Sequence, residues 1–517
     1  MQPIPVLTSS QARRWDDLTA AAGLPLVALM ETAGRAIVAI LTSRFPTALR
    51  QGTVVAVGPG NNGGDGWVVA RALGALGLPV WVVPIGGSVS ELNGLESRLA
   101  RDAGIRQLEP DGPWPTVGLV VDAILGTGAK GAPRPPVAAL LARLGELAVP
   151  VVAIDGPTGL DLDTGTSHDV LRAGLTITFG GYRRGQLLAR DEVGDLTVVD
   201  LGFVAPPVEW PLLFLPRDAA RAIAPLGAGS HKGDRGRVVV IGGDRGMTGA
   251  VRLAARAAFA AGAGLVHVIA PAASVAVLAA AEPDLQTTVS EFEHLSEAAA
   301  ALLARADAVV IGPGLGRAAG RAGFMAEVAQ STRAPMVVDA DGLIAFGGDV
   351  AGLARLAEGR AMVVTPHAGE FRALFPTEVS ELGVDPWTAA DVAAARLDAA
   401  VLLKGVPTVV AMPGQAPLTI AAGNPGLATG GSGDTLAGLI AAWLGQGVDT
   451  CVAAASGALA LGEAADLAAR RFTARAMRPM DVIAALPDVW RRWDQIRREP
   501  PAPLAPILHE MPAPARV

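Results

Sequence analysis

Short runs of β-branched and other apolar residues recur along this 517-residue chain, and each is followed by a turn and an alanine-rich stretch. Residues 53–57, 151–154 and 237–241 are examples. These runs do not alternate apolar with polar residues, which predicts strands buried on both faces, as in parallel sheets covered by helices. The fold class that we predict is therefore α/β.

The length exceeds what one ordinary hydrophobic core supports, so we expect at least two domains. Prolines are dense between residues 205 and 216 and break regular structure there. They separate the predicted strands into two series and place the domain boundary at roughly 205–225. We assign residues 1–215 to a first domain, 220–495 to a second, and the proline-rich residues 496–517 to a disordered tail.

Composition and charge exclude several classes of function. The 42 Lys and Arg residues are outnumbered by 49 Asp and Glu, which gives a net charge of −7 and no basic surplus for nucleic acid. The single cysteine, Cys451, cannot form an intramolecular disulfide, and its apolar surroundings predict a buried thiol. The N-terminus lacks the pattern of a signal peptide, and the uncharged residues 257–281 are too rich in alanine and glycine for a membrane span. We expect a cytoplasmic homo-oligomer that binds neither nucleic acid nor membrane.

A glycine-rich segment near the C-terminus, Asn424–Asp434, ends in an acid and leads into an apolar stretch. Consecutive glycines let backbone N–H groups point into one hollow, and a following helix start favours anions, so the segment suits phosphate. A carboxylate at its end would repel phosphate, unless Asp434 takes a proton from a hydroxyl that attacks the phosphate. The alternative is a flexible loop in which Asp434 caps a buried helix.

Three acids in the first domain, Asp65, Asp122 and Asp155, each stand beside glycine at the end of an apolar run. The carboxyl ends of parallel strands line one crevice, so these acids are expected to converge. For any one acid alone, a helix N-cap is the alternative. The oxygens of the Asn61–Gly66 loop suit a cation as well as an anion.

The second domain repeats the pattern with several polar turns after apolar strands. His367 follows one such strand and has two interpretations, a helix cap or a group that faces a ligand. Lys404 also has two, since it either extends to solvent or holds a nucleotide phosphate as a point charge.

The first half of the chain resembles the NAD(P)H-hydrate epimerase domain over roughly residues 1–205. The resemblance rests on residues 7–11, 30–34, 61–66, 122–128 and 155–159, taken in order. Thr32 and Gly156 depart from the family pattern without removing a ligand oxygen. The resemblance implies a Rossmann-like three-layer α/β/α domain, K+ held by Asn62, Asp122 and Thr158, and Asp155 as a catalytic residue. It implies contacts to hydrated NAD(P)H from Asn61, Asn62, Gly63, Gly64, Asp65, Gly126, Thr127, Gly128, Ala129, Lys130, Gly131, Ala132 and Asp155.

The second half resembles the ADP- or ATP-dependent NAD(P)H-hydrate dehydratases of the ribokinase-like superfamily over roughly residues 225–495. The resemblance rests on turns at 242–250, 312–316, 339–341, 365–370 and 403–405 and on the Gly430–Asp434 loop. It implies a ribokinase-like α/β/α domain that uses Mg2+ and ADP, with Asp434 as the catalytic residue. Contacts to the hydrated cofactor are implied for Ala250, Gly314, His367 and Asp434. Contacts to the nucleotide are implied for Lys404, Gly405, Val406, Pro407, Thr408, Asn424, Thr429, Gly430, Gly431, Ser432 and Gly433.

Together the two resemblances imply a bifunctional metabolite-repair enzyme. Its first domain would interconvert the R and S forms of hydrated NADH or NADPH, and its second would dehydrate the S form at the expense of ADP, giving AMP and phosphate. The residues alone leave two alternatives open, a ribokinase-like kinase of a vitamin or sugar and a non-catalytic nucleotide-binding scaffold. Chemistry alone does not separate ADP from ATP, and the resemblance favours ADP.

Overall fold

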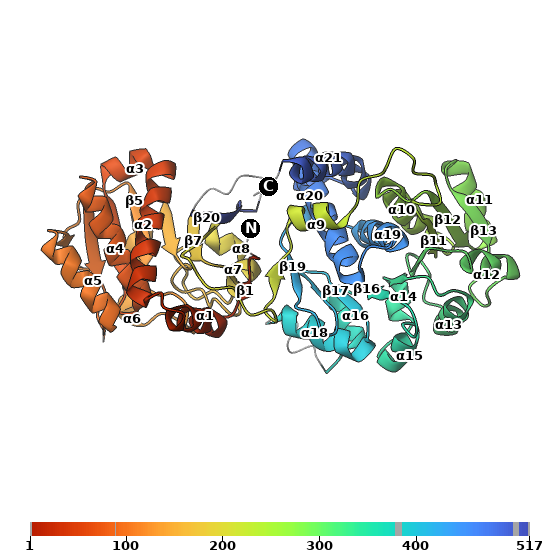
Figure 1. The fold of residues 1–517 in the computed structure, drawn as a ribbon, viewed down its shortest axis with the longest axis horizontal. Helices are drawn as coiled ribbons and strands as arrows, with labels where there is room; N and C mark the ends of the chain where they lie inside the picture. Colours follow the sequence, from red (N-terminus) through yellow and green to blue (C-terminus); the bar gives the residue numbers. More distant parts are fainter. Residues whose placement is uncertain (1–2, 88, 378–384, 500–505, 515–517) are drawn as a thin grey trace. The chain divides into compact units, whose positions relative to one another are not determined.

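The structure, a computed structural model, describes residues 3–87, 89–377, 385–499 and 506–514. The chain forms two compact units, residues 1–210 with 502–514, and residues 211–501 with 515–517. Both units are α/β, as the unalternating apolar runs predicted (Figure 1).

Unit 1 is built on an eight-stranded sheet with the order β20-β9-β7-β6-β5-β2-β3-β4. All of its neighbouring strands pair in parallel except β20 and β9, which are antiparallel. The strands are β2 (Thr53–Val57), β3 (Val80–Pro84), β4 (Arg106–Gln107), β5 (Leu119–Ala123), β6 (Val151–Ile154), β7 (Leu175–Phe179), β9 (Asp195–Val199) and β20 (Ile507–Met511), and a separate parallel pair is formed by β1 (Val6–Leu7) and β8 (Tyr182–Arg183).

Helices cover both faces of this sheet. On one face, apolar residues of α1, α2 and α4 pack against β2, β5 and β6 around Trp15, Ile37 and Trp67. On the other, Leu140, Leu141 and Leu144 of α6 pack against the alternate residues of the same strands. This gives the three-layer arrangement. The helices are α1 (Ser9–Ala21), α2 (Leu26–Arg44), α3 (Pro46–Gln51), α4 (Asn61–Ala75), α5 (Glu91–Asp102), α6 (Pro135–Glu146), α7 (Arg184–Leu188) and α8 (Arg190–Val193).

Unit 2 is built on a ten-stranded sheet with the order β10-β19-β18-β17-β16-β15-β14-β11-β12-β13. Its central strands are parallel, but β18 pairs antiparallel with both β17 and β19, so the prediction of wholly parallel sheets is wrong at this edge. The short turn 404–407 between β17 and β18 permits the reversal. The strands are β10 (Leu212–Leu213), β11 (Arg237–Ile241), β12 (Leu265–Ala270), β13 (Gln286–Val289), β14 (Ala308–Ile311), β15 (Met336–Val338), β16 (Met362–Val364), β17 (Ala400–Leu403), β18 (Thr408–Ala411) and β19 (Leu418–Ile420).

One face of the second sheet is covered by α10, α19, α20 and α21, whose alanines and leucines pack on Val238, Val310 and Val363. The neighbouring strand residues point to the opposite face, where Trp387 of α18 donates a hydrogen bond to Thr419 of β19 (2.8 Å). The helices are α9 (Pro216–Ala222), α10 (Thr248–Ala260), α11 (Ala272–Ala281), α12 (Glu297–Leu303), α13 (Arg321–Ser331), α14 (Asp341–Ile344), α15 (Val350–Arg355), α16 (Ala368–Leu374), α18 (Pro386–Leu397), the 3-10 helix η1 (Pro425–Leu427), α19 (Ser432–Gly445), α20 (Thr450–Ala476) and α21 (Pro479–Arg498).

Within the described part of the chain, two helices are long and apolar enough to cross a membrane, α2 and α20. Most of α20 is buried within unit 2, where it carries the buried thiol of Cys451. Half of the apolar window of α2 is buried, and it packs on α4. Both helices therefore have partners within their own units. Residues 257–281 form helix, strand and helix, as expected.

The C-terminal segment corrects one prediction. Residues 496–498 belong to α21, and residues 507–511 form β20 at the edge of the unit 1 sheet, so the predicted disorder of 496–517 is wrong for these residues. Residues 500–505 and 515–517 lie outside the described residues. The boundary also moves, because Leu212 and Leu213 pair with β19 and residues 211–215 belong to unit 2.

The contact between α10 and α19 requires glycine at one position. A Cβ added to Gly438 would lie 2.0 Å from the backbone oxygen of Ala254. We expect Gly438→Val to force the helices apart and to lower the free energy of unfolding by about 3 kcal/mol. The matched control is Gly323→Ala on α13, where an added Cβ meets nothing within 4 Å. Chemical denaturation measures both variants, and equal stability of Gly438→Val and the parent protein would contradict the close-packing argument.

Candidate active sites

The first site lies where β5 and β6 end in unit 1. Asp122, on β5, is fully buried, and its carboxylate accepts hydrogen bonds from the Thr158 backbone N–H (2.7 Å), the Thr158 hydroxyl (2.7 Å) and the Ile124 N–H (3.2 Å). Burial raises the pKa of Asp122, and the Thr158 hydrogen bonds oppose that shift. The two predicted cation ligands Asp122 and Thr158 are therefore adjacent.

Asp155 follows β6 directly, and each of its carboxylate oxygens has a partner. One oxygen accepts from the Thr178 hydroxyl (3.2 Å) and pairs with the Arg183 guanidinium (3.0 Å), and the other accepts from the Thr127 N–H (3.0 Å). Its backbone has φ 62°, in the left-handed region that only glycine adopts without cost. Strained backbone of this kind concentrates at functional sites.

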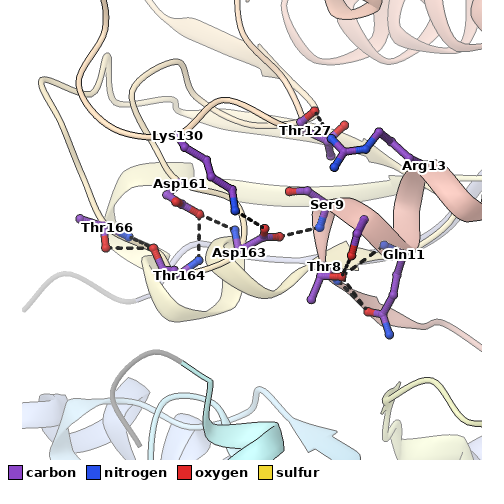
Figure 2. A network of polar contacts seen from close by, with 11 residues as sticks. Thr8, Ser9, Gln11, Arg13, Thr127, Lys130, Asp161, Asp163, Thr164 and Thr166 are labelled. Carbon is purple, nitrogen blue, oxygen red and sulfur yellow. Dashed lines mark hydrogen bonds and ion pairs between the residues drawn. The ribbon is translucent and has the colours of Figure 1, made fainter. Parts of the chain in front are cut away.

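The loop 126–132, predicted to contact hydrated NAD(P)H, lies against the start of α1 (Figure 2). Arg13 donates to the Thr127 carbonyl (3.4 Å), and Lys130 pairs with Asp163 (3.8 Å). Asp163 also accepts from the Ser9 N–H (2.5 Å), so it links the loop to the helix. Figure 2 shows these contacts gathered beside the first turn of α1.

The Asn61–Asp65 segment forms the first turn of α4 rather than a free loop. A Cβ on Gly63 would lie 2.0 Å from the Gly58 carbonyl oxygen, so the backbone approaches too closely for any side chain. Asn62 lies against Gly126, whose added Cβ would be 3.0 Å from the Asn62 side chain. This places the segment next to the predicted substrate loop. Asp155 raises the pKa of Asp65 further after burial, which connects these two acids.

The residues fit a hard cation on their own chemistry. Asn62, Asp122 and Thr158 are all oxygen donors, and Asp122 is a buried carboxylate whose pKa is raised by burial. A bound cation would offset the cost of that buried charge. Among the described residues the buried Asn62 amide nitrogen has no hydrogen-bond partner, which fits an amide whose oxygen is turned toward an ion.

The second site lies at the start of α19 in unit 2. Gly431, with φ 99°, is the N-cap, and Asp434 occupies the first turn, so the carboxylate does not cap the helix. Burial and the neighbouring Asp339 raise the pKa of Asp434 to about 6, and Lys404 opposes this shift. The Ser432 hydroxyl is buried without a partner in the described structure. The loop thus presents an unpaired donor beside an acid that is ionised at neutral pH.

Lys404 points into the site rather than to solvent. Its ammonium pairs with Asp339 (2.9 Å) and Glu370 (3.6 Å), and Asp339 also accepts from the Thr365 hydroxyl (2.8 Å). Burial lowers the pKa of Lys404, but Asp339 and Glu370 more than offset this and its pKa lies above the ordinary value. A Cβ on Gly433 would lie 3.2 Å from the Lys404 ammonium, so the lysine reaches the glycine loop.

His367 caps a helix, which is one of the two interpretations of this residue. Its Nδ1 accepts from the N–H groups of Gly369 (2.9 Å) and Glu370 (3.3 Å), and it is the N-cap of α16. Its Nε2 lies 3.2 Å from Glu370, and more than half of the side chain is exposed. The cap uses Nδ1 and not Nε2. The predicted contact of His367 with a ligand stays a prediction.

Of the other predicted site residues, some lie next to one another and some are held by local contacts. Gly314 and Ala250 are adjacent, since a Cβ on Gly314 would lie 3.3 Å from that of Ala250. The side chain of Asn424 is instead engaged locally, accepting from the Gly426 N–H (3.0 Å) and donating to Asp466 (2.9 Å). The remaining nucleotide-binding predictions lie in two places. Gly405, Val406 and Pro407 lie in the turn between β17 and β18, and Thr408 begins β18; Thr429, Gly430 and Gly431 precede α19, and Gly433 lies in its first turn.

Sequence reasoning quoted Asp339, Asp341 and Glu370 without assigning them to the site, and it missed Asp16 and Arg183 altogether. The signal for Asp339 and Asp341 was present, since they follow strand β15 as the other site acids follow theirs. Between them Ala340 has φ 51°, a second strained non-glycine residue. Among the residues that the structure describes, no three acidic, histidine or cysteine side chains group closely enough to bind a metal by themselves. The carboxylates of Asp339 and Glu370 fit Mg2+ that arrives with nucleotide phosphates, which supply the other oxygen ligands.

A pocket of about 630 Å3 lies elsewhere in unit 2. It is lined by Arg256, Phe259, Glu282, Leu285 and other residues around the beginning of β12. The glycine loops follow the opposite ends of the strands, so this pocket is not part of the site around Asp434.

The comparisons with known proteins identify a family for each unit. Residues 238–488 match the family described as NAD(P)H-hydrate dehydratase, and residues 27–185 match the family described as YjeF-related protein N-terminus. The bifunctional NAD(P)H-hydrate repair enzyme Nnr of Escherichia coli (strain K12) is 38% identical over 477 residues, covering 90% of this chain and 89% of the relative. The enzyme of the same name from Pyrobaculum aerophilum is 36% identical over 492 residues, covering 91% and 95%.

Among solved structures, the ADP/ATP-dependent NAD(P)H-hydrate dehydratase of Bacillus subtilis, co-crystallised with ATP/Mg2+, is similar to the chain. It is 26% identical with a TM-score of 0.49, covering 55% of this chain and 98% of that one. The full-length sequence relatives are the deciding observation, because they span both units. The chain belongs to the family of bifunctional NAD(P)H-hydrate repair enzymes.

Proposed function

We propose that unit 1 interconverts the R and S epimers of hydrated NADH and NADPH, and that unit 2 dehydrates the S epimer with ADP, giving AMP and phosphate. The observation that carries the proposal is the cluster at the start of α19. Asp434, Lys404 and the loop glycines place a proton acceptor, a cation and phosphate-binding N–H groups together. The family relationship supplies the substrate.

Dehydration needs such a cluster because hydroxide is a poor leaving group. Transfer of a phosphoryl group to the substrate hydroxyl makes a good leaving group, and the lone pair of the ring nitrogen then expels phosphate. Asp434, ionised above pH 6, takes the hydroxyl proton. Lys404 and the N–H groups of the loop stabilise the charge on the moving phosphoryl group. Bound Mg2+ would neutralise phosphate charge, with Asp339 and Glu370 as the residues placed to hold it.

One assay tests the proposal against its two alternatives. The protein is incubated with an epimeric mixture of hydrated NADH and with either ADP or ATP, and the recovery of NADH absorbance is followed. Recovery with release of free phosphate supports the dehydratase. A stable phosphoester would instead indicate a vitamin or sugar kinase, and no turnover would indicate a nucleotide-binding scaffold. The faster nucleotide identifies the co-substrate, for which we propose ADP.

We further propose that the cation of unit 1 is K+, bound by Asn62, Asp122 and Thr158. Replacing K+ with tetramethylammonium, which is too large for three converging side chains, should slow consumption of the R epimer at least about tenfold, because the buried Asp122 loses its counter-ion. Dehydration of pure S epimer in the same buffers is the control, since Asp122 lies outside unit 2. Equal rates of R-epimer consumption in both salts, or an ion bound at Mg2+-like distances of about 2.1 Å, would contradict K+.

A further inference from the structure

Helix α1 carries an acid on its buried face. Asp16 follows Ala12 by four residues and Ser9 by seven, so it lies on the same face as these two buried residues. The Trp15 indole donates to the Val204 carbonyl (2.9 Å), which fixes the rotation of the helix about its axis. Asp16 itself is partly buried. An acid on a buried helix face needs a reason, since solvated acids face outward.

The position of α1 explains what this acid faces. One turn before Asp16, Arg13 reaches Thr127 in the loop 126–132 (Figure 2). A Cβ on Gly128 would lie 2.8 Å from the Arg13 guanidinium. Strand β1 pairs with β8 so that Leu7 is opposite Arg183, the partner of Asp155. The helix therefore lies against the predicted substrate loop, and the charges of Arg183 and Asp155 are close enough to Asp16 to shift its pKa.

The acids of this cluster differ in proton affinity. Burial raises the pKa of Asp16 to about 6, where Arg183 lowers it and Asp155 and Asp17 raise it. Burial raises the pKa of Asp65 well above its ordinary value, and Asp155, Asp16 and Glu96 add to the shift. At neutral pH Asp16 is therefore mostly ionised, whereas its surroundings favour the protonated form of Asp65. Two neighbouring carboxyl groups with separated proton affinities are the usual arrangement of an acid with a base.

Asp155 is less suited to either task. Its two oxygens already accept hydrogen bonds from Thr178, Arg183 and the Thr127 N–H. The Thr127 contact instead holds the predicted substrate loop in place, and the negative charge helps Asp65 to keep its proton. These contacts are those of a residue that positions its neighbours.

We propose that Asp65 and Asp16 are the acid and the base of the epimerisation and that Asp155 is a positioning residue, an inference that rests on the proposed function of unit 1. Asp65 protonates the hydroxyl on the carbon next to the ring nitrogen. The C–O bond breaks, the nitrogen lone pair forms a C=N bond, and water leaves. A water molecule then adds to the opposite face of that carbon, the C=N electrons return to nitrogen, and Asp16 takes the proton of the added water. One water leaves and one enters, and the proton that moved from Asp65 to Asp16 returns through solvent or in the reverse reaction.

The test uses the full-length protein with R epimer as substrate. Unit 2 of the same chain removes the S epimer as it forms, so consumption of R epimer reports the rate of epimerisation. Asp16→Asn keeps the shape of the side chain but cannot accept the proton, so kcat for R-epimer consumption should fall at least about a hundredfold. Dehydration of pure S epimer should be unchanged. The control is Asp17→Asn, the exposed neighbour on the same helix, which should retain the parent rate.

The pH profile separates a chemical role from a structural one. Asp16 must be ionised to act as a base, so kcat/KM for the R epimer should fall as pH drops through about 6. The groups that face it are Arg183 from β8, Asp155 after β6, Asp65 on α4 and Asp17 on its own helix. Asp16→Asn should lack this limb in its residual activity, and Asp16→Glu should restore it. Asp16→Glu also carries the test if the asparagine variant does not fold.

Three results would overturn the assignment. They are parent-level epimerisation by Asp16→Asn, an unchanged limb near pH 6 in that variant, and enzymatic epimerisation in H2 18O that leaves the product hydroxyl unlabelled. A different failure has a different signature. If the parent protein consumes R epimer no faster than spontaneous epimerisation allows, the proposed function of unit 1 fails, and the acid and base assignment fails with it.

Discussion

Asp434→Asn should abolish dehydration of the S epimer while ADP still binds. The amide has the shape of the carboxylate but cannot accept the hydroxyl proton, so kcat should fall at least about a hundredfold. ADP affinity should be retained, because the phosphate-binding groups of the loop are backbone N–H groups, the Ser432 hydroxyl and Lys404. The two quantities are measured as recovery of NADH absorbance and as ADP binding by calorimetry.

The pH dependence of the same reaction provides an independent check. Burial raises the pKa of Asp434 to about 6, and a base must be ionised. The rate of dehydration should therefore be at its full value above that pH and should fall as pH drops through it. Asp434→Asn should show no such limb in its residual activity. The matched control is Asp391→Asn, an exposed acid on α18 that should keep the parent rate and profile. Near-normal turnover by Asp434→Asn would refute its role as base.

The parts of the fold that sequence predicted are those with a local cause. Unalternating apolar runs predicted the buried strands, because this pattern lies within a few residues. Glycines beside acids, an equally local pattern, predicted two candidate sites. Asp434 and Lys404 share a site only because β17 and α19 are brought together by the sheet. Their contact, through Gly433, depends on tertiary packing that no short pattern contains.

Asp16 illustrates the opposite case, in which a signal was present and overlooked. Its spacing from Ser9 and Ala12 places it on the buried face of α1, and helical periodicity alone could have identified it. Arg183 gave a weaker signal, because it is one of two consecutive arginines, and charged pairs of this kind usually face solvent. Its burial follows from the pairing of β1 with β8, which no spacing rule predicts.

The C-terminal strand was missed because proline-rich flanks masked a short apolar segment. β20 pairs with β9 across a register from Ile507↔Val199 to Met511↔Leu196, and the Tyr182 hydroxyl lies 2.7 Å from His509 Nδ1. Glu510 pairs with Arg44 of α2. The strand covers what would otherwise be the exposed edge of β9. Strand β20 thus completes the sheet of the first unit.

This connection changes what separating the two units should do. A fragment of residues 1–210 contains the predicted epimerase site but lacks β20, so it should be less stable than the same fragment joined by a Gly/Ser linker to residues 506–514. Loss of the strand's ladder and of the Tyr182–His509 hydrogen bond should cost about 3 kcal/mol of unfolding free energy. Thermal and urea unfolding compare the two fragments.

The activities should follow the same division. Residues 211–501 should dehydrate S epimer and leave R epimer to spontaneous epimerisation, because Asp434, Lys404 and the loop glycines all belong to that unit. Adding the 1–210 fragment with its linked strand should restore rapid consumption of the mixture, and adding 1–210 alone should restore less, in proportion to its folded fraction.

His509→Ala within the linked strand is the matched control and should recover only part of the lost stability. Equal stability with and without β20 would show that the strand merely rests on the sheet edge. Two folded fragments that are each inactive until recombined would show that the sites share residues across the two units, contrary to the division drawn here.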